Sequence, residues 1–132
     1  MTELNELYRC NICGNIVEVV GNSYGELVCC NEPMEKIESK VQEDGLFEKH
    51  LPVLIHDEDD KYLIRVGSSE HPMEEKHYIM FIEAISKDNK YLKRVFLNPG
   101  ERPELYPDCK CNHLNARELC NIHGLFESEL NK

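Results

Sequence analysis

The sequence is short of positive charge, and it contains neither a long apolar run nor a basic leader segment. A membrane-spanning helix needs about 20 consecutive apolar residues, and no such stretch is present. The opening residues MTELNELYRC are acidic and polar, which is untypical of a secretory signal peptide. These absences predict a cytoplasmic protein that does not span a membrane.

The charge balance excludes one class of partner and constrains another. Lysine and arginine number 15 against 25 aspartates and glutamates, for a formal net charge of −10. Nucleic-acid binding depends on clustered lysine and arginine, so no nucleic-acid partner is expected. A small anionic substrate would be repelled by the overall charge, and its site would therefore need a local positive feature.

Cysteine, in contrast, is abundant. The chain has seven cysteines, and in a cytosolic protein this number indicates metal ligands or redox thiols rather than structural disulfides. They form two groups: Cys10, Cys13, Cys29 and Cys30 near the N-terminus, and Cys109, Cys111 and Cys120 near the C-terminus. Because their number is odd, simple pairing cannot use all of them.

The N-terminal residues 1–37 are predicted to form a small β module. The β-branched stretch 15–22 and the stretch 23–30, which contains a glycine turn, predict a hairpin. A module of fewer than about 40 residues buries too little apolar surface to be stable alone. A metal held by its cysteines would supply the missing stability.

Residues 38–132 are predicted to form a second, all-β domain. Short strand-like stretches alternate with acidic or glycine- and proline-containing breaks, a spacing typical of a β-sandwich. The expected strands are residues 50–57, 61–68, 77–86, 91–98, 117–123 and 125–130. Residues 116–120 could instead form a short helix, and the sequence leaves both alternatives open.

Cys10 and Cys13 have the spacing of a metal-binding turn. Two intervening residues allow both sulfurs to approach one ion, and Gly14 permits the tight turn beneath them. Cys29 and Cys30 complete four thiolates, a set that suits zinc and iron alike. Adjacent ligands are unusual because neighbouring side chains on a strand point apart. Either the backbone bends at Cys29 and Cys30, or the tetrahedral arrangement of the four sulfurs around the metal is distorted. A thioredoxin-like role would need a βαβ context, which the sequence does not predict.

A second candidate site combines four histidines and one cysteine. Its members are His50, His71, His77, Cys120 and His123. Five ligands exceed the four of a closed zinc site, and they leave one octahedral position vacant for a small molecule. A thiolate opposite the vacancy favours iron among the redox-active metals. Fe(II) with neutral imidazoles and one thiolate carries about one net positive charge, which is the attraction that a small anion needs.

Several motifs resemble a known family. YRCNICGNIVEVV and ELVCCNEPM resemble the desulforedoxin-type domain, whereas EKHLPV, HPMEEKH and CNIHG resemble the catalytic domain of superoxide reductase. Together they resemble desulfoferrodoxin, the two-iron superoxide reductase family, over residues 7–126. The resemblance implies a desulforedoxin-like iron module (residues 1–37), an immunoglobulin-like β-sandwich superoxide reductase domain (residues 38–132) and a homodimer.

The resemblance also implies a role for each site residue. Cys10, Cys13, Cys29 and Cys30 would hold one iron in a distorted four-cysteine centre. His50, His71, His77 and His123 would be equatorial ligands of a second iron, with Cys120 as the axial ligand. Glu48 matches the family's glutamate that can occupy the sixth position in the ferric state. Lys49 matches the lysine that attracts superoxide and helps to deliver protons.

The reaction implied by the resemblance is the one-electron reduction of superoxide to hydrogen peroxide at the open ferrous position. A rubredoxin-like donor would supply the electrons, and no dioxygen would form. The alternatives are a non-catalytic iron-binding electron-transfer protein, whose histidine site would be closed, and a zinc-ribbon interaction module. A superoxide dismutase is a further alternative, and it would consume no donor.

Two features depart from the family pattern. Cys109, Cys111 and His113 are not part of it, and their alternation predicts one face of a strand. Reduced thiols are expected there, because a disulfide across one residue would be strained and is disfavoured in the cytosol. The chain also lacks the tryptophan that relatives often carry after the second histidine motif, so Tyr78 and Phe81 are expected to fill those core positions.

Overall fold

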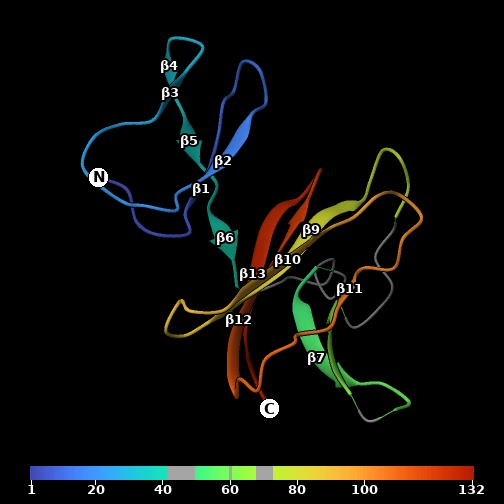
Figure 1. Ribbon diagram of the computed structural model, residues 1–132. Coiled ribbons are helices and arrows are strands. Elements are labelled where there is room, and N and C mark those ends of the chain that lie inside the picture. The colour runs from blue at the N-terminus through green and yellow to red at the C-terminus, as the bar shows by residue number, and fades with distance from the viewer. Residues whose placement is uncertain (42–49, 60, 68–72) are drawn as a thin grey trace. The chain divides into compact units, whose positions relative to one another are not determined.

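The protein forms two compact units, residues Met1–Glu38 and Ser39–Lys132 (Figure 1). The structure is a computed structural model that describes residues 1–41, 50–59, 61–67 and 73–132. Within these residues all regular structure is β, which confirms the predicted all-β class. No helix in the described part of the chain is long and apolar enough to cross a membrane.

The N-terminal unit is built from very short strands. β1 (Leu7–Arg9) lies between β2 (Ile16–Glu18) and β5 (Glu35–Lys36) in one sheet. β3 (Val28–Cys29) and β4 (Glu32–Pro33) form a separate antiparallel pair. The predicted hairpin between residues 15–22 and 23–30 is therefore wrong, because β2 pairs with β1 and β3 pairs with β4. Residues 19–27 form no strand, and the observed pairs instead flank the two turns that carry the cysteines.

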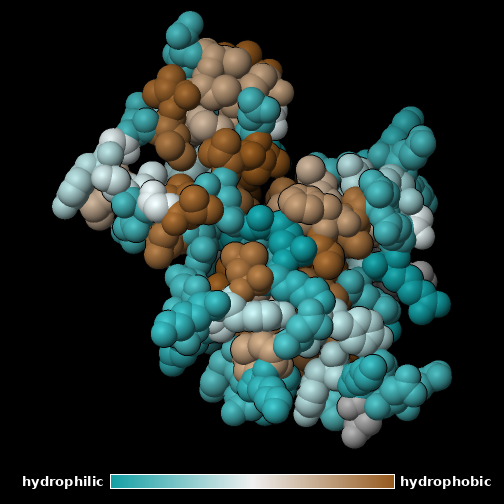
Figure 2. Space-filling view, viewed as in Figure 1, coloured by the Kyte–Doolittle hydropathy of each residue, from teal (hydrophilic) through white to brown (hydrophobic). Residues whose placement is uncertain are grey.

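This unit has little apolar core of its own. Leu7, Cys10 and Val19 are its buried hydrophobic residues, whereas Val20 and Val28 are exposed. Figure 2 shows the corresponding hydrophobic surface on this unit in brown. The unit therefore depends on some other source of stability, and its cysteines are the candidates.

The C-terminal unit consists of two sheets. Five strands lie in the order β10-β9-β12-β13-β6, and three lie in the order β11-β8-β7. The bounds are β6 (Ser39–Lys40), β7 (Pro52–His56), β8 (Tyr62–Val66), β9 (Ile79–Ser86), β10 (Leu92–Phe96), β11 (Glu104–Leu105), β12 (His113–Cys120) and β13 (Gly124–Asn131). Ile64 and Leu105 of the smaller sheet and Ile82 and Ala116 of the larger one belong to one buried core cluster. The two sheets thus pack as a β-sandwich.

The predicted strands of this unit are all present, with shifted bounds. β12 begins at His113 and ends at Cys120, so the short-helix alternative for residues 116–120 is wrong. Strands β6 and β11 are additional, and each is only two residues long. Phe81 is buried as expected, whereas Tyr78 is half-buried and directly precedes β9.

A buried ion cluster crosses the centre of the five-stranded sheet. Glu83 of β9 is fully buried, and it lies directly opposite Arg94 of β10 and Arg117 of β12 in the strand register. Arg94 Nε donates to the Glu83 carboxylate at 2.8 Å, and the Arg117 guanidinium also donates to it. The two cations compensate the desolvation of this carboxylate, which would otherwise be costly.

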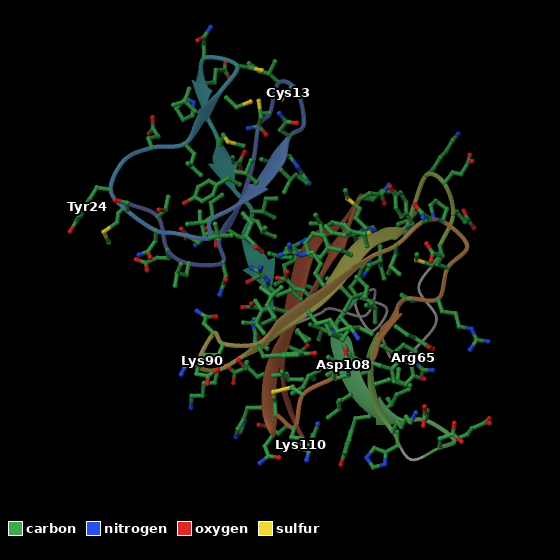
Figure 3. All side chains as sticks on the ribbon, in the orientation of Figure 1. Cys13, Tyr24, Arg65, Lys90, Asp108 and Lys110 are labelled. Carbon is green, nitrogen blue, oxygen red and sulfur yellow. A yellow bond between two sulfur atoms is a disulfide. The ribbon has the colours of Figure 1, made fainter. Side chains whose placement is uncertain are left out.

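Cys109 and Cys111 form a disulfide, drawn as a yellow bond in Figure 3. The prediction of reduced thiols at these positions is therefore wrong for this structure. The predicted strand alternation does not apply, because regular structure begins only at His113. The Cα atoms of the two cysteines are 5.2 Å apart, which lies within the usual range for a disulfide, about 4.4–6.8 Å.

Candidate metal centres

The four N-terminal cysteines converge on one point. The sulfur atoms of Cys10, Cys13, Cys29 and Cys30 all lie within 4.8 Å of one another. Cys10 and Cys13 come from the turn between β1 and β2, and the other pair comes from the turn between β3 and β4. Two short hairpins thus each present two thiols to a common centre, at the end of the unit where Figure 3 labels Cys13.

The first turn owes its shape to Gly14. Its φ of 82° lies in the left-handed region that favours glycine, and its amide donates to the Cys10 carbonyl at 3.0 Å. The Cys10 sulfur accepts hydrogen bonds from the amides of Cys13 and Ile12, both at 3.4 Å. These amide donors, that of Cys13 first, lower the pKa of Cys10 to about 6. The turn therefore stabilises a thiolate before any cation binds.

The second turn explains how adjacent thiols face one target. Cys29 pairs with Glu32 across the hairpin, so Cys30 and Asn31 are the two central residues of the turn. Their φ values are 54° and 63°, which is the pattern of a type I′ turn. The turn brings the Cys29 sulfur to 4.0 Å from that of Cys30 and 3.6 Å from that of Cys13. The bend that begins at Cys30 thus turns its side chain toward the sulfur of Cys29, the last residue of β3.

The four thiols compete for ionisation. Hydrogen bonding to the thiols of Cys13 and Cys10 raises the pKa of Cys30 to about 12, and the same contacts raise the pKa of Cys29. Four thiolates so close together need a cation to neutralise them, and a divalent metal that displaces these protons would do so. The donor set suits a tetrahedral zinc or iron site.

Three histidines form the second cluster. Ring nitrogens of His50, His77 and His123 all lie within 4.8 Å of one another. The His123 ring packs edge-on against both others, with centroid distances of 4.8 Å to His50 and 5.0 Å to His77. His50 is buried and stacks on Phe126 of β13 at 4.6 Å. Burial also lowers the pKa of His123, which favours the neutral imidazole that binds metals.

Asn121 fixes the segment that carries His77. Its Nδ2 donates to the Lys76 carbonyl at 3.1 Å, and its Oδ1 accepts from the Tyr78 amide at 2.9 Å. The Asn121 amide also donates to the Tyr78 carbonyl at 3.1 Å. His77 itself closes a tight turn through reciprocal backbone hydrogen bonds with Glu74. The turn that carries His123 is thereby joined to the turn that carries His77.

Cys120 lies at the end of β12, on the same turn as His123. Its thiol is fully buried, and it accepts hydrogen bonds from the backbone amides of His123 and Ile122. Burial raises the pKa of Cys120, and the amide bonds partly oppose this shift. Gly124 completes the turn with a φ of 90°. The sulfur is not in the group of donors that lie within 4.8 Å of one another, which among the described residues contains only the three histidines.

Three predicted site residues lie outside the described residues: Glu48, Lys49 and His71. Two residues that the sequence did not indicate lie at the site instead. One is Asn121, whose place inside the C-x-x-H motif was a usable signal. The other is Lys40 of β6, whose ammonium group donates to the His123 carbonyl at 2.9 Å and lies 5.1 Å from the centre of the Phe126 ring.

Family models cover nearly the whole chain. Residues 2–37 match the model described as "Desulfoferrodoxin, N-terminal domain", and residues 42–129 match the model described as "Desulfoferrodoxin". The chain belongs to the desulfoferrodoxin family. The resemblance seen in the sequence motifs is thereby confirmed.

Individual relatives agree with this assignment. A desulfoferrodoxin homolog of Archaeoglobus fulgidus is 47% identical over 128 residues, which cover 97% of this chain and 99% of the relative. The superoxide reductase of Treponema pallidum has the same fold, with a TM-score of 0.67 at 22% identity over 93% of this chain and 95% of that one. A superoxide reductase solved in its oxidised state is 27% identical, with a TM-score of 0.51 over 69% of this chain and 94% of that one.

Proposed function

We propose that this member of the desulfoferrodoxin family is a superoxide reductase. It would convert one superoxide, one electron and two protons into one molecule of hydrogen peroxide. The observation that carries the proposal is the convergence of His50, His77 and His123 beside the turn that begins at the buried Cys120. Solved structures named superoxide reductases share this fold.

Two iron ions are proposed. Cys10, Cys13, Cys29 and Cys30 would hold one, and His50, His71, His77, His123 and Cys120 would hold the other. The donor sets support this assignment, because four thiolates suit iron and a mixed imidazole and thiolate set suits a redox-active iron. When bound, the second iron would supply the one-electron chemistry.

The protein's own residues would prepare that site in three ways. Asn121 orients the His77 turn through hydrogen bonds on both sides of it. The amides of His123 and Ile122 stabilise negative charge on the Cys120 sulfur. Lys40 places a positive charge at the His123 carbonyl, which counteracts the net charge of −10 for an approaching anion.

Glu48 and Lys49 complete the proposal. Lys49 would attract superoxide and assist proton delivery, and Glu48 would be a further ligand of the oxidised iron. The reaction consumes one electron per superoxide, so a donor is required, and a rubredoxin-like protein is proposed for that role. A cytoplasmic homodimer is proposed as the working form.

Metal analysis and stoichiometry test the proposal together. The purified protein should contain two irons per chain with distinct visible absorption bands in its oxidised form. With a reduced rubredoxin as donor, each superoxide should oxidise one donor and yield one peroxide. A dismutase would oxidise no donor, and an electron-transfer protein with a closed histidine site would not react with superoxide. A colourless zinc protein would contradict the proposal.

A further inference from the structure

Cys109 and Cys111 lie outside both candidate metal centres. They precede β12, at the end of that strand opposite Cys120. β12 runs from His113 to Cys120, and at about 3.3 Å per residue its ends are roughly 20 Å apart. The disulfide therefore cannot share ligands with the histidine cluster, and any chemistry that it performs is separate.

The disulfide adds little to stability through chain entropy. The stabilisation from a crosslink grows with the length of the loop that it closes, and here the sequence separation is only two residues. Both cysteines do pack against the buried core cluster of the sandwich, and they would do so as thiols as well. A role in holding the fold therefore explains this crosslink poorly.

The surrounding contacts hold the segment in place independently of the sulfur–sulfur bond. The Asp108 amide donates to the Tyr91 hydroxyl at 2.9 Å, and Lys93 forms an ion pair with the Asp108 carboxylate at 2.7 Å. On the other side, the Lys132 amide donates to the Asn112 carbonyl at 3.0 Å. These contacts would keep two reduced thiols close together, so that the second thiol is always in reach of the first.

The local charge and exposure favour thiol chemistry. Both cysteines are half-buried, and Cys111 lines a surface pocket together with Tyr91. Lys110 stands between them with an exposed side chain, and the Lys132 ammonium donates to the Cys109 carbonyl at 3.3 Å (Figure 3). The neighbouring carboxylate of Asp108 is paired with Lys93. Nearby cations stabilise a thiolate, which is both the attacking and the leaving group in exchange.

We propose that Cys109 and Cys111 form a reversible dithiol–disulfide centre, a further redox site that exchanges two electrons with low-molecular-weight thiols and disulfides. In the reducing direction, a thiolate attacks one sulfur of the pair and forms a mixed disulfide, and the other sulfur leaves as a thiolate. A second small thiolate then attacks the small-molecule sulfur of the mixed disulfide, which forms the small disulfide and frees the second protein thiolate. The balance is one protein disulfide and two small thiols converted into two protein thiols and one small disulfide.

Peptide mapping after redox equilibration tests the proposal. The full-length, iron-loaded protein is equilibrated without oxygen in glutathione buffers that range from fully reduced to fully oxidised, then acid-quenched, alkylated and digested with trypsin. Trypsin cleaves after Lys110, between the two cysteines, so the reduced pair gives two separate alkylated peptides. The oxidised pair stays crosslinked. We expect the crosslinked fraction to fall from near one to near zero within the glutathione range, and to recover when the ratio is reversed.

The matched control is Cys109→Ser, which leaves both metal centres intact and should give no crosslink in any buffer. Iron content should stay unchanged across the titration, which separates this pair from the proposed iron sites. The proposal is overturned if the crosslink persists in excess reduced glutathione, or if both cysteines are alkylated in every buffer. A crosslink between two chains, or stable glutathione adducts in place of the internal bond, would also overturn it.

Discussion

Asn121 holds the backbone on both sides of His77. The amide group of its side chain bonds to the carbonyl of Lys76 and to the amide of Tyr78, at 3.1 Å and 2.9 Å. Because Asn121 itself lies between Cys120 and His123, one side chain determines how two separate ligand-bearing turns meet. Groups that orient metal ligands in this way typically contribute 10–100-fold to metal affinity or activity.

Asn121→Ala should weaken iron binding at the histidine site about tenfold or more, because both hydrogen bonds to the His77 turn are lost. Competition with a chelator, followed through the visible spectrum, measures the change. Asn121→Asp is the matched variant, since it keeps an acceptor for Tyr78 and loses the donor to Lys76. It should fall between the wild type and the alanine variant. Unchanged affinity in Asn121→Ala would rule out the orienting role.

Asn31→Ala should destabilise the turn that carries Cys30 by about 1–2 kcal/mol, because alanine disfavours the left-handed conformation found at this position. Asn31→Gly is the control, since glycine adopts that conformation freely and is preferred in type I′ turns. Urea unfolding, followed through the absorbance of the four-cysteine centre, distinguishes them. Equal losses of unfolding free energy in both variants would mean that the side chain of Asn31, and not its left-handed backbone conformation, stabilises the turn.

Glu83→Gln should cost about 3–5 kcal/mol of unfolding free energy, because it leaves the buried Arg117 guanidinium and the half-buried Arg94 guanidinium without their carboxylate. Chemical denaturation of the iron-loaded chain measures the loss. Glu129→Gln, an exposed carboxylate on β13, is the control and should change stability by less than about 0.5 kcal/mol. A Glu83 variant as stable as this control would show that the ion cluster does not contribute to the unfolding free energy.

Asp57→Ala should lower the urea midpoint at pH 7, and its effect should shrink as the pH falls below the unfolded pKa of aspartate, about 3.9. The amides of Lys61 and Asp59 and the Tyr106 hydroxyl bond to the Asp57 carboxylate, and the Lys61 amide is the first cause of its lowered pKa. A carboxyl group with a lower pKa in the folded chain stabilises the fold above its unfolded pKa, about 3.9. That contribution is lost as the pH falls through the lower, folded value.

The comparison of Asp57→Ala with the wild type at each pH removes the effects that both chains share, such as loss of iron in acid. Glu58→Ala, an exposed position in the same turn, serves as the control and should show no such pH dependence. A difference between wild type and Asp57→Ala that is constant from pH 7 to pH 2.5 would contradict the linkage.

Lys40→Met should slow the reaction with superoxide several-fold at low ionic strength, since a cation near an anion's site mainly accelerates encounter. Salt screens this attraction, so the rates of variant and wild type should converge as ionic strength rises. Pulse radiolysis measures both rates. Lys40→Arg keeps the charge and should react at close to the wild-type rate. Identical rates for Lys40→Met and wild type at low salt would exclude this role.

Much of the fold followed from the sequence because its signals are local. Alternating apolar residues fix the strands of the sandwich, and the C-x-x-C-G spacing fixes the turn beneath Cys10. Strand pairing in the N-terminal unit did not follow, because strands of two or three residues carry too little alternation to specify a partner. The start of β12 at His113 was not predicted, because polar and apolar residues alternate only weakly over residues 113–116. These residues also adjoin the irregular segment 106–112.

The candidate sites, like the fold, were predicted in part from the sequence. The residues of both clusters were named from spacing and family resemblance, and the structure brings four cysteines and three of the histidines together. Lys40 could not be anticipated, because its contact with His123 depends on the parallel pairing of β6 with β13. The disulfide was expected to be absent because of strain and of the reducing cytosol, but the chain brings the two Cα atoms to 5.2 Å, within the usual range for a disulfide.

The turn from Cys120 to Gly124 also connects β12 to β13. The same few residues therefore reverse the chain and carry two proposed ligands, so their number cannot change without moving a donor atom. For protein engineering, this hairpin is the wrong place to insert a tag, a reporter or a longer loop. The turn between β9 and β10, at residues 87–90, bears no proposed ligand and is the suitable site for such insertions.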